Sequence, residues 1–120
     1  MTKSPALIAA ERYVELVNDQ RFDQVGSLFA DDAVVLSPTG EVVSGKVAIT
    51  ALWADEFSKS GPSSVTITSA VSDNSVCVVE LSPQLPGESA PRSGHVVDHF
   101  TVDPAGAIVR LAIYLRPFST

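Results

Sequence analysis

The chain has 120 residues, the size of one domain, since single hydrophobic cores usually form in chains of about 100–150 residues. Its hydrophobic content of 45% is enough for a core, and a charged content of only 18% argues against a disordered chain or a coiled coil. Fourteen acidic residues against eight basic ones give a net charge of −6, so neither nucleic acid nor an anionic membrane surface is expected as a partner.

Three helical segments are predicted in the first half of the chain. Ser4 and Pro5 mark the start of the first, since serine caps a helix and proline fits its first turn. Behind them, apolar residues recur at helical spacing as far as Val17. Shorter patterns of the same kind predict a second helix over residues 22–29 and a third over residues 47–57.

Strands dominate the second half. Residues 34–36 predict a short early strand, closed by a turn at residues 38–40. From Ser64 the apolar period changes to two. The strands expected there cover residues 64–71, 76–81, 95–102 and 107–116, and the polar, proline-rich stretch 82–92 is expected to be a loop. This order is typical of an α+β fold in which a curved sheet wraps the first helix.

Asp98 is the most informative residue of these strands. Strand alternation places it on an apolar face with Val96 and Phe100, while His95 and His99 fall on the opposite face. A carboxyl among apolar side chains loses hydration, which raises its pKa. A protonated Asp98 would be a hydrogen-bond donor suited to a developing oxyanion. The alternative is a buried aspartate tied to a neighbouring hydroxyl or backbone group.

Tyr13 and the last strand complete the candidate site. Tyr13 lies on the apolar face of the first helix, where a tyrosine is more often a core residue than a catalytic donor. If that helix lies in the concavity of the sheet, Tyr13 and Asp98 could donate to one ligand oxygen. In the last strand, alternation places Val109, Leu111 and Ile113 on the apolar face.

Other motifs predict no further chemistry. His95 and His99 lack a third metal ligand at a recognisable spacing, so we expect them at a solvated surface or a subunit interface. The single cysteine, Cys77, excludes an intramolecular disulfide and is expected to be a core thiol. The longest apolar run, residues 6–10, is too short for a membrane span or a signal peptide. We therefore expect a soluble, cytoplasmic protein, residues 1–120 forming a single domain without metal or cofactor.

Several motifs resemble those of bacterial ketosteroid isomerases. They are Arg12-Tyr13-Val14, Leu28-Phe29-Ala30-Asp31-Asp32-Ala33, Pro38-x-Gly40 and Asp98-His99-Phe100. The second motif recurs throughout the NTF2-like (SnoaL-like) superfamily, whereas Tyr13 combined with the last motif is more specific. The resemblance extends over most of the chain. It implies a cone-shaped α+β fold, with a curved antiparallel or mixed sheet wrapped around three N-terminal helices, a deep apolar cavity and a homodimer.

The resemblance also implies site residues. An oxyanion hole made of a tyrosine and a protonated aspartate falls on Tyr13 and Asp98, and the catalytic base falls on Ser37. A neutral serine hydroxyl is a very poor base, so the sequence does not predict efficient isomerisation. The apolar residues expected around the ligand are Val17, Phe29, Leu52, Trp53, Val96, Phe100, Leu111 and Ile113.

Three functions stay open on this basis. The first is a ketosteroid isomerase-like protein that binds an apolar ketone or phenol, such as a steroid or a polycyclic, through Tyr13 and protonated Asp98. The second is a SnoaL-like polyketide cyclase or isomerase in which Asp98 is itself the acid and base. The third is a binding protein that holds a small ligand without turnover. All three predict a small apolar ligand as the partner.

Overall fold

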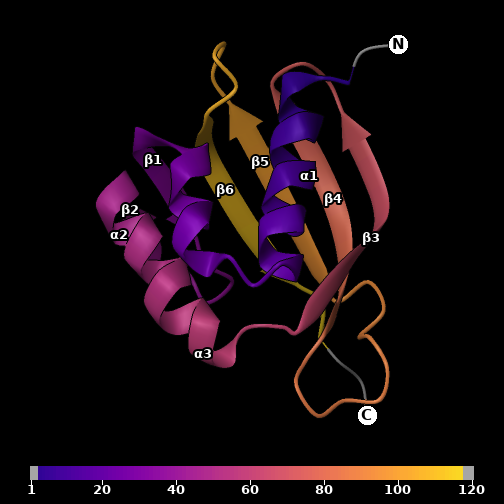
Figure 1. Ribbon diagram of the computed structural model, residues 1–120. Helices are drawn as coiled ribbons and strands as arrows, with labels where there is room; N and C mark the ends of the chain where they lie inside the picture. The colour runs from indigo at the N-terminus through magenta and orange to yellow at the C-terminus, as the bar shows by residue number, and fades with distance from the viewer. Residues whose placement is uncertain (1–2, 118–120) are drawn as a thin grey trace.

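One six-stranded sheet curves around the first helix (Figure 1). The computed structural model describes residues 3–117. The strands are β1 (Phe29–Leu36), β2 (Val42–Ser44), β3 (Ser64–Ser72), β4 (Val76–Gln84), β5 (Val96–Val102) and β6 (Ile108–Leu115). Their order in the sheet is β2-β1-β6-β5-β4-β3, and β1 and β6 run parallel while the other neighbours are antiparallel. The fold is therefore α+β with a mixed sheet, as predicted.

Three helical segments cover the concave side of the sheet. They are α1 (Pro5–Asn18), the 3₁₀ helix η1 (Phe22–Leu28), and a continuous segment made of α2 (Lys46–Ala51), η2 (Leu52–Phe57) and α3 (Ser58–Ser60). Ser4 caps α1 as predicted, since its Oγ accepts the backbone N–H of Leu7 at 3.1 Å. The η2 turn is π-helical, a wider turn that is often found at functional sites. Within residues 3–117 no helix is long and apolar enough to cross a membrane.

Helix α1 lies along the edge strand β3 and is bound to it at both ends. At its end, the Asn18 amide donates to the backbone oxygen of Val65 at 2.9 Å and accepts the backbone N–H of Val65 at 2.7 Å. At its start, the hydroxyls of Ser4 and Ser72 lie 3.2 Å apart. These contacts hold the apolar face of α1 inside the curve of the sheet.

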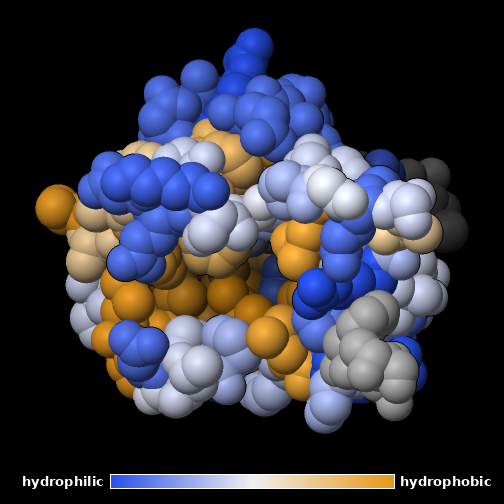
Figure 2. Space-filling model, turned by 90° about the horizontal axis from the view of Figure 1, so that it is seen from below, coloured by the Kyte–Doolittle hydropathy of each residue, from blue (hydrophilic) through white to orange (hydrophobic). Residues whose placement is uncertain are grey.

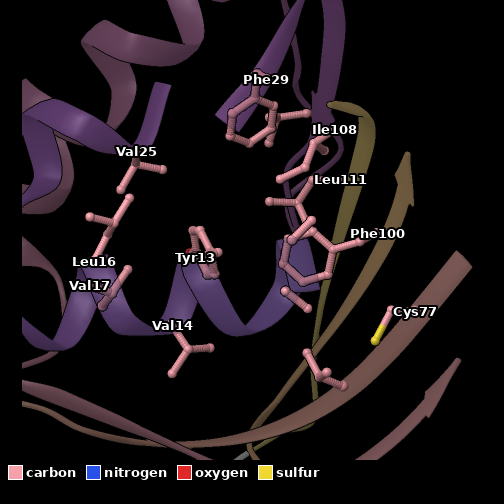
Figure 3. Close-up of a cluster of buried hydrophobic side chains, with 14 of the residues drawn as sticks. Tyr13, Val14, Leu16, Val17, Val25, Phe29, Cys77, Phe100, Ile108 and Leu111 are labelled. Atoms are coloured by element: carbon pink, nitrogen blue, oxygen red, sulfur yellow. The ribbon is translucent and has the colours of Figure 1, made fainter. Parts of the chain in front are cut away.

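The core fills the space between α1 and the central strands. Figure 3 shows Tyr13 of α1 directed toward Phe100 of β5 and Leu111 of β6. The ring centroids of Tyr13 and Phe100 lie 5.5 Å apart. Cys77 is fully buried in this core, as predicted. The packing brings Tyr13, at the start of the chain, next to the strand that carries Asp98.

The structure corrects several details. Strand β1 begins at Phe29, five residues before the expected strand 34–36, and the expected helix over residues 22–29 is a 3₁₀ helix that ends at Leu28. Strand β2 was not predicted, and β4 continues through Gln84, so the first part of the expected loop 82–92 belongs to the sheet. A bulge in the β5–β6 pair, where Thr101 lies opposite Arg110 but Val102 lies opposite Ile108, leaves Val109 as the extra residue. Ile108 is consequently fully buried in the core position that alternation assigned to Val109.

Candidate functional site

A cavity of about 270 Å³ lies between α1, the end of the third helical segment and the sheet. It opens at the end of the molecule seen in Figure 2, where hydrophobic residues surround a hollow. Its apolar wall is formed by Val17, Pro38, Phe57, Pro62, Val65, Leu81, Pro83, Leu85, Val96, Ile113 and Leu115. Tyr13, Ser60, Gly61, Arg92, His95 and Asp98 complete the lining. This volume lies just below the usual range of about 300–1,000 Å³ for small-molecule sites, and the lining is mostly apolar.

Tyr13 and Asp98 both line this cavity, from opposite layers of the fold. Tyr13 reaches it from α1 and is 6% exposed, while Asp98 reaches it from the middle of β5 and is 2% exposed. Among residues 3–117, no hydrogen-bond partner lies within reach of Asp98 Oδ1. A buried polar atom without a partner is costly, so this oxygen is suited to meet a ligand group in the cavity.

Burial controls the protonation of both groups. Loss of hydration raises the pKa of Asp98 to about 7, because its carboxylate form is disfavoured away from water. The pKa of Tyr13 is also raised, first by burial and second by the negative charge that Asp98 carries when ionised. The hydrogen bond from Trp53 has the opposite, smaller effect on Tyr13. Below neutral pH, both side chains therefore carry a proton that they can donate.

Trp53 determines where the Tyr13 proton can go. The indole Nε1 donates a hydrogen bond to Tyr13 Oη at 3.2 Å. An indole can only donate, so Tyr13 accepts in this contact and its own hydrogen is available to another acceptor. Behind this contact, the rings of Trp53 and Phe57 stack with centroids 5.0 Å apart and planes 10° apart. The π-helical turn thus presents Trp53 to Tyr13 and Phe57 to the cavity.

Ser37 lies in the turn between β1 and β2, outside the cavity lining. Its Oγ accepts the backbone N–H groups of Thr39 at 3.3 Å and Glu41 at 3.1 Å, and lies 3.0 Å from Thr39 Oγ1. The next residue, Pro38, does line the cavity, and Ser37 faces an adjoining hollow bordered by Ile113. The serine hydroxyl is therefore occupied in closing the turn.

The structure divides the expected ligand contacts into two groups. Val17, Val96 and Ile113 line the cavity. The other five residues lie in the core or against it, outside the lining: Phe29, Leu52, Trp53, Phe100 and Leu111. Trp53 acts on the site through Tyr13. The role of each as a ligand contact stays a prediction.

Sequence reasoning missed several lining residues. Phe57 was noted only as part of a helix, and the periodicity does not indicate which of its aromatic residues reaches the cavity. Alternation predicts His95 on the face opposite Asp98, but His95 lines the cavity because it precedes the first residue of β5. Arg92 belongs to the loop between β4 and β5, for which no pattern gave a signal.

No group of three His, Cys, Asp or Glu side chains in the described range could hold a metal ion.

The family model that describes the SnoaL-like domain matches residues 10–111 of this chain. No curated protein shows a significant sequence match.

Solved structures share the fold at low sequence identity. Rv0760c from Mycobacterium tuberculosis is 23% identical, with 97% of this chain and 94% of that one covered and a TM-score of 0.78. A computationally designed 17-OHP binder is 24% identical, with coverages of 96% and 93% and a TM-score of 0.75. A proposed ketosteroid isomerase from Kribbella flavida is 17% identical, with coverages of 97% and 81% and a TM-score of 0.77. The chain therefore belongs to the SnoaL-like family and has the NTF2-like fold.

Proposed function

We propose that the protein binds a flat, apolar molecule with one ketone or phenol oxygen, such as a steroid or another polycyclic compound. Tyr13 and protonated Asp98 hold that oxygen with two hydrogen bonds. One observation carries the proposal: two buried hydroxyl donors line the same apolar cavity, and Asp98 Oδ1 has no partner within residues 3–117. Donors in a dry site stabilise an oxygen with partial negative charge far better than donors in water.

Similar structures support this class of ligand. The structure of Rv0760c in complex with estradiol-17β-hemisuccinate is 22% identical to this chain, with a TM-score of 0.73. The designed neighbour is a 17-OHP binder. The fold therefore accommodates such molecules in other proteins, and the cavity of this chain is apolar apart from a few polar side chains.

Binding without isomerisation fits the residues better than catalysis of a double-bond shift. Isomerisation requires a base beside the ligand, and the hydroxyl of Ser37 is both a poor base and engaged in its turn. Among the described residues that line the cavity, Asp98 is the only carboxyl.

One observation favours a second function, that of a SnoaL-like cyclase or isomerase. The pKa of Asp98 is raised to about 7, in the range where a carboxyl exchanges protons efficiently at neutral pH. In that case Asp98 itself would be the acid and base. Binding and cyclase functions differ in whether Asp98 must give up its proton.

Ligand binding is tested first, by isothermal titration calorimetry with estradiol against the wild type, Asp98→Asn and Tyr13→Phe. Tyr13→Phe loses a donor but keeps the ring, so affinity should fall about 5- to 10-fold, the value of one hydrogen bond. Asp98→Asn keeps a donor and the shape of the side chain, so it should bind estradiol at pH 8 at least as well as the wild type. No binding by the wild type, or full affinity in Tyr13→Phe, would contradict the proposal.

Catalysis is tested with an unconjugated ketosteroid, by following the absorbance of the conjugated enone. We expect no turnover by the wild type and a measurable gain in Ser37→Asp, since an aspartate can also accept the turn N–H groups. Turnover by the wild type would show that another group acts as base. Absence of turnover in a folded Ser37→Asp would mean that a carboxylate in this turn does not reach the bound ketosteroid.

The homodimer and the cytoplasmic location stay predictions. Tyr114 and Leu115 of β6 are 54% and 48% exposed, which is high for large apolar side chains at the end of a central strand. Analytical ultracentrifugation of the full chain measures the oligomeric state directly.

A further inference from the structure

An arginine lines the cavity of this acidic protein. The net charge of the chain is −6, yet Arg92 stands in the wall, and its side chain is only 28% exposed. The one carboxyl among the described lining residues is Asp98, at the buried end. The cavity thus has a carboxyl group at its inner end and, near its opening, an arginine that forms an ion pair with Glu88.

The loop between β4 and β5 fixes the position of Arg92. Its backbone N–H donates to the oxygen of Pro83 at 2.8 Å, and its backbone oxygen accepts from the N–H of His95 at 3.3 Å. Its Nε donates to Glu88 Oε2 at 3.1 Å. A guanidinium has five N–H donors and commonly serves more than one acceptor, so a ligand oxygen can share Arg92 with Glu88.

A second arginine lies against the same loop. The backbone N–H of Arg116 donates to the oxygen of His95 at 2.8 Å, and its Nη2 lies 3.4 Å from the backbone oxygen of Ser93. The nearby carboxylate of Glu80 is directed to Thr68, whose Oγ1 donates to it at 3.0 Å, and does not line the cavity. Among the described residues, the opening thus holds two arginines, Arg92 and Arg116, against the carboxylate of Glu88, and this excess of positive charge favours an anion there.

The backbone spacing along β5 gives the order of magnitude of the distance between the two polar ends. His95, which is bonded to Arg92, precedes Asp98 by three residues of extended chain, or about 10 Å at about 3.3 Å per residue. The apolar wall between them includes Val96, Leu81 and Ile113. A rigid molecule of several fused rings has this length and this apolar middle.

We propose that Arg92 binds a carboxylate or similar anionic group at the distal end of an elongated polycyclic ligand. This inference rests on the proposed function, in which Tyr13 and Asp98 hold the oxygen at the other end. The ligand class is thereby narrowed to polycyclic phenols or ketones with an acidic tail. In the competing interpretation, Arg92 pins its loop through Glu88 and takes no part in binding.

The test compares two probes that differ only in the tail, estradiol and estradiol-17β-hemisuccinate, by isothermal titration calorimetry. The wild type should bind the hemisuccinate about 10- to 100-fold more tightly, as expected for hydrogen bonds to a charged group. Arg92→Gln should reduce this ratio to near one, because it removes the charge that only the hemisuccinate tail is proposed to contact. Arg116→Gln is the matched control, since it removes the same charge beside the same loop but outside the lining, and should keep most of the ratio.

The outcomes separate the two proposals. If the wild type binds neither probe, the proposed function fails. If it binds both equally, or if Arg92→Gln keeps the ratio, the proposed function stands and the role of Arg92 is refuted. An equal loss of affinity for both probes in Arg92→Gln would show instead that Arg92 only stabilises the loop between β4 and β5. If Arg92→Gln does not fold, Arg92→Lys is used instead, because lysine keeps the charge but lacks the planar guanidinium. Its ratio of hemisuccinate affinity to estradiol affinity should be lower than that of the wild type and greater than one.

Discussion

Asp98→Asn removes a carboxyl group that binds its proton more tightly in the folded chain than in the unfolded chain. The pKa of Asp98 is raised to about 7 in the folded protein by burial, against about 3.9 in an unfolded chain. The folded state therefore binds this proton more tightly. The stability linked to it is fully present below about pH 4 and is lost as the pH rises to about 7.

The size of the effect follows from the shift. About three pKa units, at about 1.4 kcal/mol each, correspond to about 4 kcal/mol of unfolding free energy. Asparagine has nearly the same shape as aspartic acid and does not ionise. The unfolding free energy of Asp98→Asn minus that of the wild type should thus increase by about 4 kcal/mol between pH 4 and pH 8.

Urea unfolding at several pH values measures this difference. The chain has one tryptophan, Trp53, which is fully buried, so its fluorescence reports unfolding. Other titrating groups are common to the two proteins and cancel in the difference. A carbon-13 NMR titration of the Asp98 carboxyl should have its midpoint near 7.

A difference that stays constant from pH 4 to pH 8 would refute the reasoning, because it would mean that Asp98 titrates alike in both states. A carboxyl midpoint near 4 in the folded protein would have the same meaning. In that case Asp98 would be ionised at neutral pH and could not donate to a ligand oxygen.

Three further variants test the surroundings of the site. Trp53→Phe removes the hydrogen bond to Tyr13 and should weaken estradiol binding about 5-fold by calorimetry; unchanged affinity would mean that Tyr13 needs no such partner. Phe57→Leu should cost aromatic ligands about 2- to 10-fold in affinity and saturated analogues little, and an equal loss for both would exclude a ring contact. Gly26→Ala places a Cβ 1.9 Å from Thr50 Oγ1 and 3.0 Å from Thr50 Cα, so rotation of the Thr50 side chain cannot relieve the contact, and the unfolding free energy in urea should fall by about 1–3 kcal/mol. A neutral result would mean that η1 and α2 move apart at little cost.

Local patterns were sufficient for much of the fold. The cap at Ser4, the helical period of α1 and the strand period around Asp98 depend on neighbouring residues, and the structure agrees with each. Strand β2 and the bulge at Val109 depend on pairing with β1 and β5, the preceding strands of their hairpins, and not on the period of their own residues. Such pairing leaves no mark in a single sequence, because it is determined by tertiary packing.

The candidate site, like the fold, was predictable only where a local sequence pattern indicated it. Tyr13 and Asp98 stand out because a polar group interrupts an apolar face, which a sequence reveals. The division between Trp53, in the core, and Phe57, in the cavity wall, depends on the π-helical turn, which alters the helical period locally. The place of Arg92 in the cavity wall depends on the loop between β4 and β5, which folds back so that Arg92 bonds to Pro83. A loop has no regular spacing of apolar residues, so the sequence gives no signal for this contact.

The contacts between α1 and β3 also determine how the sheet can grow. An edge strand with free backbone groups invites another strand to add to it, but the side chain of Asn18 occupies both backbone groups of Val65. The helix then follows β3 as far as the contact between Ser4 and Ser72. At the other edge, β2 has only three residues and offers little to pair with. Extension of the sheet is therefore hindered at the Val65 end of β3 and weak at β2, which favours a dimer that forms through a face of the fold.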